Sequence, residues 1–127
     1  MTYVDRWNEQ TVAKQDQVRQ FVQNGQLEFI NGGWCMSDEA APYYVDMVDQ
    51  QTIGHQFLLQ NFGPAAIPKT GWQIDPFGHS RTMGTLFALM GMNSWFFGRI
   101  DWQVFESNRT KRLEFMINRT VKFASRT

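Results

Sequence analysis

Apolar and polar positions along the chain follow two repeating patterns, one typical of amphipathic helices and one typical of buried strands. Apolar side chains recur at close to helical spacing in residues 4–24, 37–62 and 80–91, which predicts three helices. Ser37 and Ser80 are suitable N-cap residues for the second and third of them. On the second helix, one apolar face is expected, formed by Tyr44, Val48, Leu58, Leu59 and Phe62.

Short strands are predicted between these helices, at residues 27–30, 71–75 and 95–97. Pro76 ends the second strand because proline cannot donate to a sheet ladder. The third strand is continuously apolar, so we expect it to be buried on both faces. Alternation of helix and strand is typical of parallel strands joined by helical crossovers, and the fold class is therefore predicted to be α/β.

Composition narrows the classes of partner. The 127 residues carry 12 basic and 12 acidic side chains, so the overall charge indicates neither nucleic acid nor an anionic membrane as partner. Cys35 is the one cysteine, which excludes an intramolecular disulfide framework. No apolar run approaches the length of a membrane span, and residues 1–6 do not resemble a targeting segment. The basic stretch 109–127 is interpreted as a helix with a solvated charged face rather than a nucleic-acid-binding or lipid-binding tail.

Asp75 is the first candidate for chemistry. It stands at the end of the predicted strand 71–75 and before the turn at Gly78. Open α/β sheets and βα barrels place their functional groups at this position. The alternative is an aspartate that accepts backbone hydrogen bonds in the turn, as is common at Asp-Pro steps.

Arg99 is the second candidate. It follows the strand 95–97, so its guanidinium should emerge at the same edge of the sheet as Asp75. There it could hold the carboxylate oxygens by charge-assisted hydrogen bonds. The alternative is a structural salt bridge to Asp101 or Glu106.

Other polar residues receive structural interpretations. The acids Asp38 and Glu39 suit the first turn of a helix, where the macrodipole favours negative charge. His55 is expected to be a hydrogen-bonded core residue, and His79 a member of the turn after Asp75. Trp34 could stack on a sugar, but we expect it to be buried.

Three segments together resemble a known enzyme family. They are IDPFGHS at 74–80, LEFINGGWCMSDEA at 27–40 and FFGRID at 96–101. In this order and spacing they resemble the lysosomal-type α-mannosidases, the zinc-dependent retaining glycosidases of glycoside hydrolase family 38. The resemblance extends over about residues 7–115.

The resemblance implies a fold and a cellular role. The chain would form part of an irregular βα barrel, incomplete here because three strands cannot close a barrel. Residues 1–115 would be a partial catalytic domain, and residues 116–127 a basic tail. The enzyme would remove terminal α-linked mannose from glycoprotein N-glycans in the lysosome or secretory pathway. The glycosylation sequons at 108–110 and 118–120 fit such an enzyme.

The resemblance also implies roles for two residues. Asp75 would be the nucleophile and one ligand of a single zinc ion, and Arg99 would lie beside it. The acid/base carboxylate and the remaining zinc ligands, a His-x-Asp pair and a later histidine, belong to segments that this chain does not contain. The alternative is therefore a non-catalytic fragment of the same fold that cannot hold zinc. A small nucleotide-binding module is disfavoured, because Gly32 and Gly33 lack the further spacing of a phosphate-binding loop.

Overall fold

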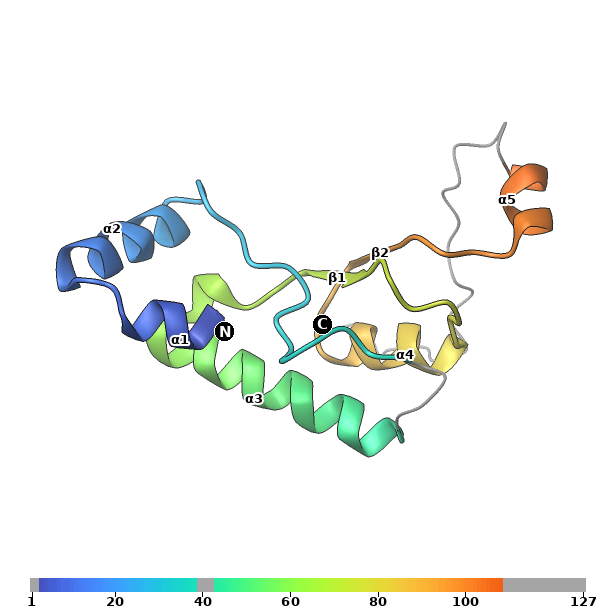
Figure 1. Cartoon of the computed structure of the whole chain (residues 1–127), viewed down its shortest axis with the longest axis horizontal. Helices are drawn as coiled ribbons and strands as arrows, with labels where there is room; N and C mark the ends of the chain where they lie inside the picture. Colours follow the sequence, from blue (N-terminus) through green and yellow to red (C-terminus); the bar gives the residue numbers. More distant parts are fainter. Residues whose placement is uncertain (1–2, 39–42, 109–127) are drawn as a thin grey trace, which may run out of the picture.

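The computed structural model of the chain describes residues 3–38 and 43–108 (Figure 1). In these residues the helices and strands are α1 (Tyr3–Asn8), α2 (Val12–Gln23), α3 (Tyr44–Phe62), the 3-10 helix η1 (Pro64–Ala66), β1 (Thr70–Gln73), α4 (Arg81–Leu89), β2 (Ser94–Phe97) and α5 (Trp102–Asn108). From α3 onward the predicted alternation of helix and strand is confirmed. The expected helical form of the stretch 109–127 lies outside the described residues.

The single helix expected over residues 4–24 is two helices, α1 and α2. Thr11 separates them, because its extended backbone places the side-chain oxygen where it accepts from the Lys14 N–H at 3.4 Å. A threonine hydroxyl that caps a new helix in this way competes with continuation of the previous one. The expected end of the helical pattern at residue 24 is confirmed to within one residue, since α2 ends at Gln23, and Gly25 just beyond it has a φ of 77°.

The strand expected at residues 27–30 is absent, and this segment is irregular. The following residue, Asn31, instead covers the outer edge of β1. Its N–H donates to the Thr70 carbonyl at 2.7 Å, and its side-chain oxygen accepts from the Trp72 N–H at 3.2 Å. One asparagine thus satisfies the backbone groups for which a neighbouring strand was expected.

Helix α3 begins later than expected. Its N-cap is Tyr43, which makes no side-chain capping bond, and Ser37 does not cap it. The Ser37 N–H donates to the side chain of Gln73, so this serine is engaged with the sheet. Glu39 falls in residues 39–42, outside the described part of the chain. The buried face of α3 also differs from the expected one: Met47, Gln51, Leu58 and Phe62 are buried, whereas Tyr44 and Leu59 are exposed.

β1 and β2 are parallel, as predicted, with Thr70 opposite Ser94 and Gln73 opposite Phe97. Helix α4 is the crossover between them, and its residue Phe87 lies against Gly71, where an added Cβ would be 2.7 Å from the ring. The prediction that β2 is buried on both faces is wrong, because Phe96 is 58% exposed. A two-stranded parallel sheet is compatible with the α/β class, and the barrel stays a prediction.

Two apolar clusters hold the described residues together. One joins α1, α2, α3 and η1, and the other packs α3 and α4 beneath the sheet. Their buried members are Trp7, Val22, Leu58, Phe62 and Ala66 in the first and Met47, Met83, Phe87 and Met92 in the second. Within the described residues, no helix combines the length and apolarity needed to cross a membrane.

The outer face of the sheet generates a prediction about the chain on its own. Trp72 and Phe96 lie opposite each other there, with ring centroids 6.3 Å apart, and the outer edge of β2 has no partner strand among the described residues. Exposed apolar strands with a free edge promote association. We expect the isolated chain to self-associate and to melt without a cooperative transition, as measured by light scattering and calorimetry.

Phe96→Lys should reduce this association because it places a charge on the exposed strand. The matched control is Leu89→Lys, at a residue of α4 that is 59% exposed and lies off the sheet. A monomeric chain with a cooperative transition would contradict the prediction. An equal reduction of self-association by Phe96→Lys and Leu89→Lys would also contradict it.

Candidate active site

The carboxyl ends of β1 and β2 bring Asp75 and Arg99 together. Gln73 is paired with Phe97, and Asp75 and Arg99 each stand two residues further along. The parallel register therefore continues past the strands and sets the two side chains opposite each other. Arg99 Nη2 donates to Asp75 Oδ1 at 2.7 Å, and no other hydrogen bond to this carboxylate occurs within the described residues. The alternative salt bridge from Arg99 to Asp101 or Glu106 is not the pairing found.

This ion pair is open to solvent. The side chains of Asp75 and Arg99 are 64% and 62% exposed. An ion pair this exposed stabilises a fold by only about 0–1 kcal/mol. Its importance is therefore geometric: the guanidinium fixes one carboxylate oxygen at the edge of the sheet.

The turn after β1 places Asp75 outside the sheet. Pro76 is buried and has no N–H, so the ladder cannot continue through it. Ser80 then caps α4 by accepting from the Met83 N–H at 3.1 Å. The predicted turn and cap are confirmed, although β1 ends two residues before Asp75 rather than at it.

Gly98 lets the two strand ends approach each other. A Cβ at this position would lie 2.7 Å from the Ile74 carbonyl oxygen, closer than real Cβ contacts allow. Ile74 and Gly98 directly precede Asp75 and Arg99. Any larger side chain at 98 would push apart the two segments that carry the ion pair.

His79 lies in the turn as expected and supports the other strand. Its Nε2 is 3.1 Å from the Arg99 carbonyl oxygen, which makes Nε2 the protonated nitrogen that donates. The ring packs on Phe97, with centroids 4.6 Å apart. His79 thus holds the backbone of Arg99 rather than its guanidinium.

The remaining candidates lie apart from this ion pair. His55 contacts the Asn31 carbonyl oxygen through Nε2 at 3.1 Å, so its expected hydrogen-bonded role is confirmed. Asp38 is exposed and lies before the start of α3. Trp34 is 58% exposed, and the expectation that it is buried was wrong because the loop carrying it runs over the surface.

Sequence reasoning missed a buried polar cluster behind Asp75. Asn31, Ser37 and Gln73 are at most 7% exposed, and Gln73 hydrogen-bonds to both of the others. The available signal was Gln73 itself, a polar residue in a segment predicted to be a buried strand. Buried polar side chains need partners, so Gln73 required a polar neighbour from elsewhere in the chain.

The described residues contain no group of three or more histidine, cysteine, aspartate or glutamate side chains that could hold a metal ion. A zinc site takes about four ligands. Asp75 could supply one of them, so the described residues alone do not fit a zinc ion.

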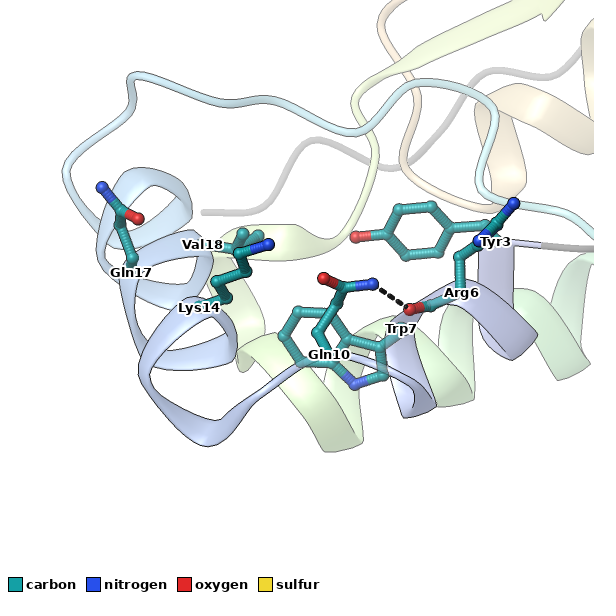
Figure 2. Close-up of a pocket in the computed structure, with 7 residues that line it drawn as sticks. All are labelled: Tyr3, Arg6, Trp7, Gln10, Lys14, Gln17 and Val18. Carbon is teal, nitrogen blue, oxygen red and sulfur yellow. Dashed lines mark hydrogen bonds between the residues drawn. The ribbon is translucent and has the colours of Figure 1, made fainter.

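A separate cleft of about 360 Å³ lies between α1 and α2 (Figure 2). Its lining residues are Tyr3, Arg6, Trp7, Gln10, Lys14, Gln17 and Val18. Figure 1 places these helices on the other side of the molecule from α4 and α5, and neither Asp75 nor Arg99 lines the cleft.

Comparison with known proteins decides the family. Residues 1–120 match the model of the glycosyl hydrolases family 38 N-terminal domain. The chain belongs to this family. It is 51% identical to lysosomal alpha-mannosidase of Dictyostelium discoideum over 111 residues, which is 87% of this chain and 11% of that protein. The lysosomal alpha-mannosidases of mouse (Mus musculus) and human (Homo sapiens) are 52% and 54% identical over 114 and 97 residues.

These matches cover 89% of the chain for the mouse protein and 76% for the human protein. The chain spans about a tenth of the length of these relatives, which is 11% for mouse and 10% for human. A chimaera in which this chain replaces the matching segment of the Dictyostelium protein, called the Dictyostelium chimaera below, therefore provides a host for variants.

In the Dictyostelium chimaera, Gly98→Ala should lower the free energy of unfolding by about 1–3 kcal/mol, because the added methyl group overpacks the strand crossing at Ile74. Gly78→Ala is the matched control, since an added Cβ there meets nothing within 4 Å. The measurement is the thermal midpoint of each variant. Equal midpoints for the two alanines would show that the close approach at Gly98 is not required.

Proposed function

We propose that this chain is a segment of the catalytic domain of a retaining α-mannosidase in which Asp75 is the nucleophile. The observation that carries the proposal is the Asp75–Arg99 ion pair of 2.7 Å at the carboxyl ends of two parallel strands. The family membership and the names of the relatives, which are lysosomal alpha-mannosidases, support the substrate class. Residues 1–115 form the catalytic segment in this proposal.

The geometry suits a nucleophile. Arg99 donates to Oδ1 of Asp75, and Oδ2 has no hydrogen bond among the described residues. Because the two oxygens belong to one rigid carboxylate group, the bond to Oδ1 also fixes the direction of Oδ2. In the first step Asp75 bonds to the anomeric carbon of mannose while the glycosidic C–O bond breaks, and an acid protonates the departing oxygen. In the second step the group that acted as the acid, now deprotonated, acts as the base. It takes a proton from a water molecule, whose oxygen bonds to the anomeric carbon, displaces Asp75 and releases mannose.

The acid/base group must come from outside the Asp75–Arg99 pair. Retaining glycosidases place their two carboxyl groups about 5 Å apart. Asp38 is not assigned to this role, and we place the second carboxyl group in a segment outside this chain.

The proposed enzyme also needs a zinc ion. We propose one zinc ion that takes Asp75 as one ligand and its other ligands from outside this chain. When bound beside the nucleophile, such an ion stabilises negative charge and binds substrate oxygens. The steps above are derived from Asp75 and Arg99 alone, because the described residues do not form a zinc site by themselves.

The cellular role follows the relatives. We propose mannose-containing oligosaccharides of glycoproteins as substrates, and the lysosome or secretory pathway as the location. The α/β segment would form part of an irregular βα barrel. Its further strands would pair with the outer edge of β2, which has no partner strand among the described residues. The alternative is a non-catalytic fragment of the same fold that cannot hold zinc.

In the Dictyostelium chimaera, Asp75→Asn should reduce kcat for an α-mannoside by more than about 10³-fold, because an amide cannot form the glycosyl ester. The matched control is Asp101→Asn. Asp101 caps α5 by accepting from the N–H groups of Gln103 and Val104, and an asparagine oxygen can do the same. The control should keep its activity.

A tenth or more of the original activity in Asp75→Asn would remove Asp75 from the nucleophile role. A folded chimaera that is inactive before any substitution would favour the non-catalytic alternative.

Arg99→Lys should lower kcat and change KM only modestly, because lysine keeps the charge but cannot place a donor as the planar guanidinium places Nη2 against Asp75 Oδ1. Arg81→Lys, at the exposed start of α4, is the control. Steady-state kinetics of both variants in the same chimaera are the measurement. Unchanged kinetics in Arg99→Lys would make the ion pair a structural contact only.

A further inference from the structure

Gln73 is the most deeply buried polar residue that the proposed mechanism does not use. It is 0% exposed and is the last residue of β1, two positions before Asp75. Ser37 and Asn31, at 3% and 7% exposure, lie beside it and come from a loop more than thirty positions earlier in the chain. These three residues are called the Gln73 clamp below.

Both ends of the Gln73 amide are bonded to that loop. Its Oε1 accepts from the Ser37 N–H at 2.8 Å, and its Nε2 donates to Asn31 Oδ1 at 3.1 Å. The same Asn31 oxygen accepts from the Trp72 N–H at 3.2 Å. Asn31 has a φ of 57°, a left-handed backbone that asparagine adopts more readily than most residues. The end of β1 is therefore fixed on the side opposite β2.

Asp75 itself has few restraints. It is 64% exposed, and within the described residues its side chain is held by Arg99 alone. Its backbone position therefore depends on what fixes the end of β1. The ladder to β2 fixes one side of that end, and the Gln73 clamp fixes the other.

We infer that Gln73 is a positioning residue for Asp75, through which the loop of Asn31 and Ser37 sets where the nucleophile stands relative to the substrate. The inference rests on the proposed function and adds a residue to it. Displacement of a reacting group by about 1 Å can cost about 10²-fold in rate, so a clamp two residues away can act strongly without touching substrate.

The chain offers a closely matched control in Gln51. It is 1% exposed, and neither atom of its amide has a hydrogen-bond partner among the described residues. Methionine has nearly the shape of glutamine without its hydrogen bonds. Gln73→Met therefore breaks the clamp while filling the same space, and Gln51→Met changes an equally buried amide that makes no such bonds.

The experiment compares kcat, KM and the thermal midpoint of both variants in the Dictyostelium chimaera. We expect Gln73→Met to lower kcat for an α-mannoside by at least about tenfold with KM changed by no more than about twofold, because the nucleophile is displaced while the sugar still binds. Gln51→Met should keep kcat and KM, with a thermal midpoint unchanged or higher.

A second variant protects the test against misfolding of Gln73→Met. Asn31→Gly removes the side-chain oxygen that accepts hydrogen bonds from Gln73 Nε2 and from the Trp72 N–H. Glycine adopts the φ of 57° at this position without strain. This variant should show the same fall in kcat with a nearly constant KM. A purely structural clamp would instead lower the thermal midpoint and leave the kcat of the folded enzyme intact, and that result would overturn the inference.

Equal losses of kcat in Gln51→Met and Gln73→Met would also overturn it, because the effect would then be general core damage. The inference and the proposed function fail in different ways. A tenth or more of the original activity in Asp75→Asn would defeat the proposed function. An inactive Asp75→Asn together with an unchanged kcat in Gln73→Met would defeat only the positioning role.

Discussion

The parallel register between β1 and β2 is the constraint on which the candidate site depends. With Gln73 opposite Phe97, continuation of the two chains by two residues places Asp75 opposite Arg99, and the ion pair of 2.7 Å follows. Gly98 allows the close approach that this register needs. A slip by one residue would turn the alternating side chains of the strand to the other face and separate the pair.

The Asp75–Arg99 ion pair is exposed to water in this segment. Electrostatic catalysis is strongest in a site from which water is excluded, yet both side chains are more than 60% exposed. On the outer face of the sheet, Phe96 is also 58% exposed. In the proposal, further parts of a catalytic domain cover both features. The relatives, of which this chain spans about a tenth, are long enough to contain such parts.

Local chemistry made part of this structure predictable from the sequence. Ser80 as a cap, the turn at Pro76 and the parallel crossover through α4 follow from short-range rules, and with them the meeting of Asp75 and Arg99. Two of the errors arose where a polar side chain bonds to the backbone. Thr11 divides the first helix, and Asn31 takes the place of a strand beside β1. Hydrophobic periodicity reports neither contact, because polar side chains make both of them, and the Asn31 contact also joins residues 41 positions apart.

The central claim is that Asp75 becomes covalently bonded to the sugar, and it can be tested by trapping that bond. An activated fluorinated mannoside, which forms the glycosyl ester faster than water removes it, would be incubated with the Dictyostelium chimaera, and the labelled peptide identified by mass spectrometry after digestion. The account predicts one sugar per chain, attached to Asp75. A label on a different carboxylate, or continued turnover with no label on Asp75, would contradict it.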